Sequence, residues 1–315
     1  MRAEGVVDRL TETGYAAGWR LVRGLPARAV RPVFRRGADL AVRRDGPGVR
    51  RLRANLRRVV GPELPEAELD VLVRKGLRSY ARYWLEAFRL PSVPRDEVVA
   101  TMRLDGVDLL DRCLAEGRGA IVALGHSGNW DHAGAWAAYT GRPVTTVAER
   151  LKPEGLYDRF VAYRESIGIT VLPLTGGTRQ PLDALADRLR EGGLVCLVAD
   201  RDLSRRGVEV SFFDGRTRMP AGPALLALRT GAPLLVARLW FDETGTRGSI
   251  VGPMPVPAGD AVAPGDAVPQ GTGTIARVAA MTQDMADALA EGIAAHPEDW
   301  HMLQKLWLDD LGPAR

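Results

Sequence analysis

Short apolar runs alternate with longer stretches of helical periodicity over most of this 315-residue chain. Runs with the length of a buried β-strand lie at residues 119–124, 143–148, 169–174, 194–199, 207–212, 233–240 and 248–252. Stretches with helical periodicity lie between them, most clearly at 129–139, 154–166, 179–191 and 221–230. This alternation predicts an α/β fold in a single domain, with a mostly parallel central sheet flanked by helices.

Two segments break the alternation. Residues 252–274 carry repeated proline and glycine without a helical period, which predicts a long surface loop before a helix that begins near Thr274. The closing segment HPEDWHMLQKLW, residues 296–307, contains Trp300 and Trp307 seven positions apart. In a helix these two rings would share one face, either packing onto the domain or dipping into a membrane interface.

The N-terminal segment is strongly basic. The first 58 residues contain fifteen arginines, no lysine and five acidic residues, a net charge of +10, whereas the whole chain carries +4. Apolar and aromatic residues such as Trp19 and Phe34 lie between the arginines. Basic amphipathic helices of this kind bind anionic lipid headgroups. We therefore expect residues 1–60 to form a membrane-docking helical region packed on an α/β domain of residues 61–315.

A solvated basic face and a nucleic-acid surface are the alternatives for this charge. Because no DNA- or RNA-binding motif accompanies it, we expect no nucleic-acid partner. The chain also lacks a run of eighteen uncharged apolar residues and the pattern of a secretory signal. These features predict a monomeric, peripheral protein that meets an anionic membrane surface on the cytoplasmic face of the plasma membrane.

The motif HSGNWD, residues 126–131, follows the apolar run 120–124 and places polar side chains where a strand ends. Ligands bind at this edge of an open α/β sheet. His126 can accept a proton near neutral pH, because the unperturbed pKa of histidine is about 6.5. Asn129 suits a helix N-cap, so Asp131 would lie in the first helical turn and could orient His126. The motif thus predicts a general base with a carboxylate partner.

A second acidic residue follows another apolar run. Asp200 and Arg201 come directly after residues 194–199, so they should reach the same sheet edge as His126. Asp200 could support the histidine or position a substrate hydroxyl. The alternative is a structural ion pair between Asp200 and Arg201 or Arg205.

A metal site is the competing interpretation of the first motif. His132 follows Asp131 and supplies a third candidate ligand beside His126. Adjacent residues on a helix point about 100° apart, and the chain contains neither an HExxH nor a CxxC pattern. We therefore expect no metal, and a chance H-x4-D match remains the other alternative.

The ordered set of motifs carries a family resemblance. HSGNWD, ADRD at residues 199–202 and the segment 208–235 are similar to the bacterial lipid A biosynthesis acyltransferases, and most of all to the phosphatidylinositol mannoside acyltransferases of actinobacteria. The resemblance runs from about residue 70 to residues 296–300 and covers most of the chain. It implies transfer of a palmitoyl-like chain from acyl-CoA to a mannose hydroxyl of phosphatidylinositol mannoside, with an acyl carrier protein as the other donor.

The same resemblance assigns roles to individual residues. It implies that His126, Asp131 and Asp200 are catalytic, with no covalent acyl-enzyme and no cofactor. Arg164, in the sequence YRESIG, matches a family arginine associated with the acyl donor, although an exposed helix arginine is the alternative. We expect a substrate site that also includes Arg201, Trp130, Asn129 and Phe212. Further candidates to line an apolar acyl groove are Trp136, Phe213 and Met219, all of which could instead be core residues.

Three classes of function therefore compete: a membrane-surface acyltransferase, a metal-dependent hydrolase that uses His126, Asp131 and His132, and a lipid-binding protein without activity. Resistance to a chelator separates the first two. Release of thiol from acyl-CoA separates the first from the third.

Overall fold

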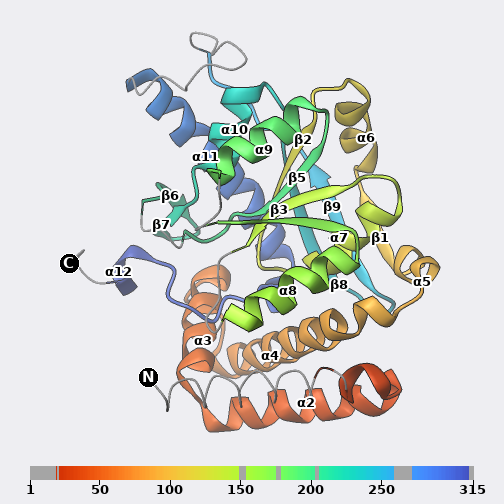
Figure 1. Cartoon of the computed structure of the whole chain (residues 1–315). Helices are drawn as coiled ribbons and strands as arrows, with labels where there is room; N and C mark the ends of the chain where they lie inside the picture. Colours follow the sequence, from red (N-terminus) through yellow and green to blue (C-terminus); the bar gives the residue numbers. More distant parts are fainter. Residues whose placement is uncertain are drawn as a thin grey trace, which may run out of the picture.

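The computed structural model describes residue 19 and residues 21–148, 154–174, 179–202, 206–258 and 272–311. Within these residues a central sheet has the strand order β1-β9-β8-β2-β5-β3-β4 (Figure 1). Its strands are β1 (Met102–Asp105), β2 (Ala120–Leu124), β3 (Val144–Ala148), β4 (Ile169–Pro173), β5 (Leu194–Val198), β8 (Leu234–Phe241) and β9 (Thr246–Val251). The pairs β8–β2, β2–β5, β5–β3 and β3–β4 are parallel. The prediction of an α/β domain with a mostly parallel sheet is confirmed.

The two strands at one side of the sheet run in the opposite direction. β9 pairs antiparallel with β8, and β1 pairs parallel with β9. The predicted strand 207–212 exists as β6 (Val208–Phe212), but it leaves the central sheet and forms an antiparallel hairpin with β7 (Gly215–Met219). The sequence pattern had not indicated β1 or β7, because both are short and carry charged residues.

Helices cover both faces of the sheet, as expected. On one face lie α9 (Pro181–Arg190), α10 (Gly222–Thr230) and α11 (Thr272–Ala295), and on the other α5 (Arg95–Ala100), α6 (Val107–Ala115), α7 (Trp130–Tyr139) and α8 (Glu154–Ser166). Each face of the sheet carries its own hydrophobic core, the first beneath α9, α10 and α11 and the second beneath α5 to α8. In β2, the side chains of Ile121 and Ala123 belong to the first core, and those of Val122 and Leu124 belong to the second. Alternate residues of one strand are thus buried on both sides, which explains its continuous apolar sequence.

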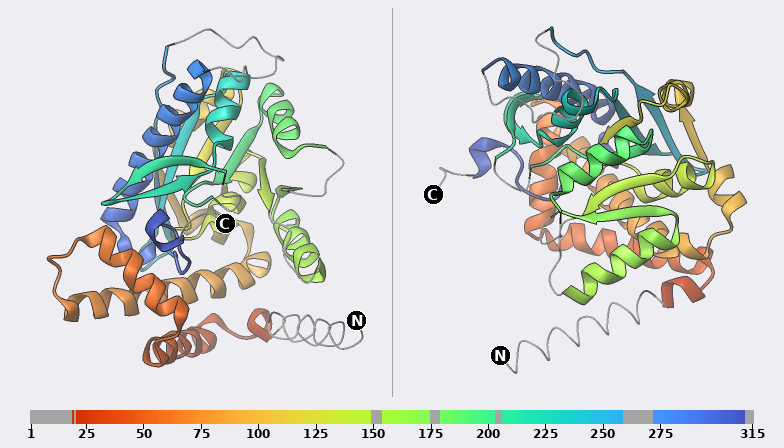
Figure 2. Two further views of the ribbon diagram at one scale, coloured as in Figure 1. Left: turned by 90° about the vertical axis from the view of Figure 1, so that its left-hand side faces the viewer. Right: turned by 45° about the horizontal axis from the view of Figure 1, so that its top comes forward.

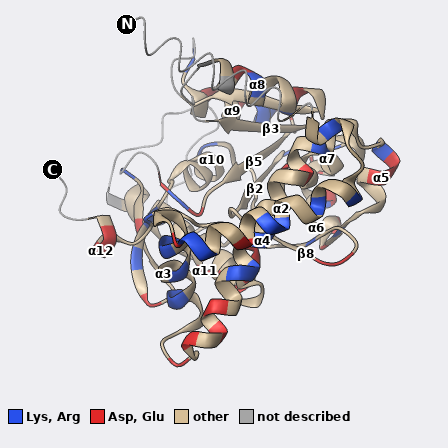
Figure 3. Ribbon diagram, turned by 90° about the horizontal axis from the view of Figure 1, so that it is seen from below, with Lys and Arg blue, Asp and Glu red and all other residues tan. Residues whose placement is uncertain are grey.

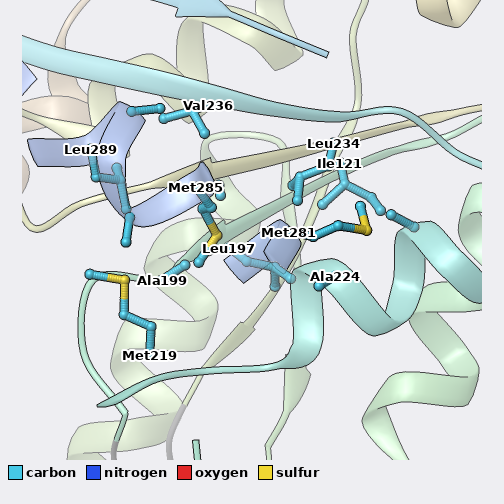
Figure 4. Packing of buried hydrophobic residues seen from close by; sticks show 14 of the residues in the cluster. Ile121, Leu197, Ala199, Met219, Ala224, Leu234, Val236, Met281, Met285 and Leu289 are labelled. Atoms are coloured by element: carbon cyan, nitrogen blue, oxygen red, sulfur yellow. The ribbon is translucent and has the colours of Figure 1, made fainter. Parts of the chain in front are cut away.

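The first core is filled by unbranched methionine side chains as well as branched residues. Figure 4 shows Met281 and Met285 of α11 packed between Leu197, Val236 and the neighbouring helix α10. Both methionines are fully buried. Methionine fills irregular spaces because its side chain is flexible. This face of the sheet is therefore a packed core.

Three N-terminal helices form a separate layer. α2 (Ala27–Arg44) and α3 (Pro47–Val60) pack on α4 (Glu66–Arg89) through a small core that includes Leu52, Leu56 and Val73. Figures 1 and 2 show α2 on the outer side of α4, at the end of the molecule opposite α10. Of the region expected at residues 1–60, the structure describes α2 and α3 as helices, residues 1–18 lie outside the described part, and the membrane-docking role stays a prediction. No described helix is long and apolar enough to span a membrane.

The closing segment is wrongly predicted as a helix. It consists of a short 3-10 turn, η2 (Pro297–Asp299), followed by extended chain in which Trp300 bridges to Ser127 and Trp307 to Thr217. These backbone pairs replace helical hydrogen bonds. Both tryptophan side chains are fully buried, so they pack on the domain and do not reach a membrane interface. Of the predicted loop 252–274, residues 259–271 lie outside the described part.

Candidate active site

His126 and Asp200 meet at the carboxyl ends of two neighbouring strands. β2 and β5 are parallel with Leu124 opposite Val198, so the residues two positions further along both chains are adjacent. The His126 imidazole Nδ1 lies 2.6 Å from Asp200 Oδ1, and the His126 backbone N–H donates to Asp200 Oδ2 at 2.9 Å. An ionised carboxylate accepts, so Nδ1 carries the proton and Nε2 keeps a free lone pair.

Asp200 is held as an anion although it is fully buried. Burial alone would raise the pKa of this carboxyl, but the charge of His126 and hydrogen bonds from His126 and Trp300 outweigh burial and lower the pKa. The Trp300 indole Nε1–H donates to Asp200 Oδ2 at 3.0 Å. The His126 side chain keeps 28% of its surface exposed, so the base can meet a substrate while its carboxylate stays dry.

The expectation that Asp131 orients His126 is wrong. Asp131 lies in the first turn of α7, where Oδ1 accepts from Arg164 Nε at 2.8 Å and Oδ2 accepts from the Tyr83 hydroxyl at 2.9 Å. Burial opposes the charge of Arg164, but the carboxylate of Asp131 outweighs burial and raises the pKa of Arg164. Both carboxylate oxygens are engaged on α4 and α8, so the partner of His126 is Asp200.

The structure uses Asn129 as a helix cap. Its Oδ1 accepts from the His132 backbone N–H at 3.0 Å, and its Nδ2 donates to Glu86 at 3.1 Å. The predicted N-cap is confirmed. The side chain is fully buried with both polar atoms bonded to protein groups, so the expected contact between Asn129 and substrate is wrong for this conformation.

Phe212 belongs to the core on the α11 face of the sheet. It is buried in the β6–β7 hairpin against Phe213, Trp300 and Trp307. β6 packs with α11 on the face of the sheet opposite α7, and the expected role of Phe212 in a substrate groove stays a prediction. Met219 belongs to the same core.

His132 does not turn toward His126. Its Nε2 donates to the Val98 carbonyl at 2.9 Å, and its Nδ1 accepts from the Thr246 hydroxyl at 2.8 Å. Burial lowers the pKa of this imidazole. The metal-ligand set suggested as an alternative is therefore not assembled, and the described residues contain no other group of three candidate ligands.

Arg201 follows Asp200 but does not pair with it. Asp200 bonds His126 and Trp300, so the alternative of an Asp200–Arg201 ion pair is wrong, and Arg205 lies outside the described residues. The half-buried Arg201 Nε has no hydrogen-bond partner in the described structure. Its expected role toward a substrate stays a prediction.

An apolar pocket lies near His126. It contains about 780 Å³ of empty space when its open mouth is counted. The pocket lies beneath α7 and crosses the sheet from β4 to β1. The Trp130 ring lies 5.5 Å from the His126 ring and forms part of the wall. Trp136 lines it as well, and the few polar residues on the wall include Asp131 and Arg164.

The chain matches a known protein family over most of its length. Residues 8–309 match the model of the bacterial lipid A biosynthesis acyltransferase family. The chain belongs to this acyltransferase family. It is 48% identical to the phosphatidylinositol mannoside acyltransferase of Mycolicibacterium smegmatis over 98% of this chain and 94% of the relative. It is also 48% identical to the enzyme of that name from Mycobacterium tuberculosis H37Rv, over 98% of this chain and 92% of the relative.

Membership of the acyltransferase family decides between the three classes of function in favour of an enzyme that transfers acyl groups. Sequence reasoning had missed two residues of the site, Tyr83 and Trp300. Tyr83 lies in a helix with no motif around it. Trp300 belongs to the segment HPEDWH, where the resemblance ends, but nothing in the sequence indicates its contact with a residue 100 positions away.

Proposed function

We propose that this acyltransferase moves a palmitoyl-like chain from acyl-CoA to a mannose hydroxyl of phosphatidylinositol mannoside at the cytoplasmic face of the plasma membrane. The observation that carries the proposal is the His126–Asp200 pair, which lies at the sheet edge near Trp130, a residue on the wall of an apolar pocket. The acceptor is inferred from the two mycobacterial relatives, whose names specify phosphatidylinositol mannoside.

His126 acts as the general base in this proposal. With Nδ1–H donated to Asp200, the lone pair on Nε2 accepts the proton of the mannose hydroxyl as its oxygen attacks the thioester carbonyl. Asp200 stabilises the imidazolium that forms. The tetrahedral intermediate then collapses, the C–S bond breaks, and the imidazolium returns its proton to the leaving thiolate. The thioester supplies the activated acyl group, so the reaction needs no cofactor.

No enzyme nucleophile takes part. Cys196 of β5 lines the pocket, but burial raises the pKa of its thiol to about 12, so almost no thiolate forms at neutral pH. The His126 imidazole is therefore left to activate the acceptor hydroxyl directly. A ternary complex of enzyme, donor and acceptor follows from this chemistry.

The acyl chain occupies the apolar pocket beneath α7. Its walls come from strands on both sides of β2 and from α7, and Trp130 stands between the pocket and His126. A chain that enters past Trp130 places its thioester next to the base. The charges of Asp131 and Arg164 on the pocket wall compensate each other, so an acyl chain can lie beside the pair. The N–H groups of Arg164 other than Nε–H can form hydrogen bonds that orient the acyl-CoA donor.

The N-terminal helices provide the membrane contact. Val33 and Leu40 are seven residues apart on α2 and 62% and 45% exposed. The exposed arginines of the helix are Arg28, Arg31, Arg35, Arg36, Arg43 and Arg44. Their side chains form no hydrogen bond or ion pair with another described residue. Figure 3 shows the basic residues of α2 and α3 on this end of the molecule. Exposed apolar residues flanked by arginines can insert between anionic lipid headgroups. In this proposal the enzyme binds the membrane as a monomer.

Thiol release from palmitoyl-CoA tests the proposal. The purified enzyme is assayed in EDTA with and without phosphatidylinositol mannoside, together with His126→Ala and the control His296→Ala, which removes a histidine stacked on Trp240 away from the site. We expect release that the acceptor stimulates, EDTA leaves unchanged, His126→Ala abolishes and His296→Ala retains. Full activity of His126→Ala would overturn the mechanism, and activity with palmitoyl-acyl carrier protein alone would replace the donor.

A further inference from the structure

The segment from Asp299 to His301, which we call the C-terminal strap, pairs with the loop that carries His126. The Gly128 N–H donates to the Asp299 carbonyl at 3.0 Å, and the His301 N–H donates to the His126 carbonyl at 2.7 Å. Between these two bonds, Trp300 lies opposite Ser127 in an antiparallel bridge. The strap thus holds the backbone of the loop as a neighbouring strand would.

The strap is itself fixed to the rest of the domain. Asp299 is buried, and its carboxylate accepts from the Ser79 hydroxyl of α4 at 2.5 Å and from the backbone N–H of Phe241 in β8 at 2.8 Å. A buried carboxylate with two donors resists displacement, because leaving its partners would strand a charge in the interior. The position of Trp300 is therefore set by contacts on both sides of it.

Trp300 reaches the carboxylate that supports the proposed base. Its indole N–H donates to Asp200 Oδ2 at 3.0 Å, and the same oxygen accepts the His126 backbone N–H at 2.9 Å. Trp300 and Asp200 are both fully buried. With two donors on Oδ2, rotation of the carboxylate is restricted, and Oδ1 remains directed at Nδ1 of the His126 ring.

We propose that Trp300 is a positioning residue for acyl transfer, whose indole N–H holds Asp200 in the orientation that accepts the Nδ1–H of His126. The inference rests on the proposed function, since Trp300 acts only through the pair of His126 and Asp200. It differs from the general packing role of a buried tryptophan, because it assigns the effect to a single N–H group.

Trp307 provides a matched control within the same core. It is fully buried like Trp300 and stacks on it with ring centroids 6.1 Å apart. Its indole N–H has no hydrogen-bond partner in the described structure. Replacing either tryptophan with phenylalanine removes a similar volume from one cluster, but only Trp300→Phe removes a donor from Asp200.

The two variants should differ in the pH dependence of kcat. The active pair carries one negative charge, and an N–H donor stabilises this form more than the form with an added proton. Loss of the donor therefore moves the acidic limb of the kcat profile to higher pH. Among the described residues, the titratable side chain of His301 also interacts electrostatically with the pair, and burial lowers its pKa to about 3, so His301 stays neutral at the pH values of the assay.

The experiment compares kcat, KM, the pH profile of kcat and the melting temperature for wild type, Trp300→Phe and Trp307→Phe. We expect Trp300→Phe to lower kcat roughly ten- to hundredfold, as loss of a hydrogen bond to a charged group does, with KM little changed and the acidic limb shifted upward. Trp307→Phe should lose thermal stability to a similar extent and keep the wild-type kcat and pH profile. Equal kcat losses in both variants, or an unshifted profile in Trp300→Phe, would overturn the inference.

A spectroscopic measurement applies even where Trp300→Phe does not fold. In Asp200→Asn, the indole N–H resonance of Trp300, assigned by its proximity to Phe213, should move while that of Trp307 stays in place. An unmoved Trp300 resonance would contradict the hydrogen bond. Activity in His126→Ala would instead overturn the proposed function, so the two failures are distinguishable.

Discussion

Arg164 of α8 donates from Nε to Oδ1 of Asp131 in α7 at 2.8 Å, and the pair lies on the wall of the apolar pocket. The bond joins two helices that are separate in the chain. The hydroxyl of Tyr83 in α4 donates a hydrogen bond to the other carboxylate oxygen of Asp131, so this one aspartate connects three helices at the pocket wall. The acidic residue of the HSGNWD motif therefore shapes the site, while a carboxylate from a different strand supports the histidine.

Asp200→Asn should abolish most activity without unfolding the protein. An amide in this position would present its oxygen or its NH₂ to Nδ1, and either arrangement weakens the stabilisation of an imidazolium. We expect kcat to fall by about 10³–10⁴-fold, by analogy with the loss of a carboxylate behind a catalytic histidine. Steady-state thiol release checks this, with circular dichroism as the control for folding. Activity within tenfold of wild type would contradict the assignment of Asp200.

Asp131→Asn should act mainly on stability. It leaves the guanidinium of Arg164 without its counter-charge in a largely buried position, which costs about 3–5 kcal/mol for a pair of this kind. Urea denaturation measures the free energy of unfolding. In a double-mutant cycle with Arg164→Gln, the double variant should lose less than the sum of the two single variants. Additive losses would show that the two side chains are not coupled.

Acid should destabilise the protein well before its carboxylates are protonated. Burial lowers the pKa of His301 from its ordinary 6.5 to about 3, so between these values the unfolded chain binds a proton that the folded chain does not. The free energy of unfolding therefore falls as pH falls below 6.5, by about 1.4 kcal/mol per pH unit for one group. Above pH 6.5 this contribution is fully present.

Urea denaturation at several pH values between 4 and 8 tests this dependence on His301→Gln and wild type. The variant should lose part of the slope below pH 6.5. Some slope should remain, because burial also lowers the pKa of His132. A variant with the same slope as wild type would show that His301 does not cause the acid sensitivity.

Filling the pocket should change the preferred chain length of the donor. Cys196 lies on the pocket wall in β5, so Cys196→Phe places a ring in space that the proposal assigns to the acyl chain. We expect kcat/KM for palmitoyl-CoA to fall relative to octanoyl-CoA, while Cys196→Ala keeps the wild-type preference. If both donors lose activity equally, the ring has disturbed the fold or the chain binds elsewhere.

Binding to anionic membranes should depend on the apolar side chains of α2. The double variant Val33→Asp and Leu40→Asp removes two exposed apolar groups and adds negative charge among the arginines. Flotation with vesicles of phosphatidylglycerol and phosphatidylcholine should show binding weakened roughly tenfold or more. The control Ile275→Asp changes a residue that is 64% exposed on α11, and should bind normally. Unchanged flotation of the double variant would rule out α2 as the docking surface.

Local patterns were sufficient for most of the sheet and for one half of the site. Apolar runs of five or six residues located β2 and β5, and parallel pairing of such strands brings His126 and Asp200 to one edge. The identity of the partner carboxylate was not predictable in this way. Asn129 caps α7, and the resulting rotation of the helix directs Asp131 toward Arg164 and away from His126. Sequence spacing allowed either direction.

The sequence by itself determined most of the strands, several helices around the sheet, the basic N-terminal region and the position of the histidine, because these depend on periodicity and charge among neighbours in the chain. The tertiary structure decided which groups surround that histidine. Trp300 reaches Asp200 across 100 positions, and β6 leaves the sheet that its apolar residues would suit. Such contacts depend on how whole helices and strands pack against one another. The packed surfaces form only when the chain folds, so local sequence patterns do not indicate which residues meet.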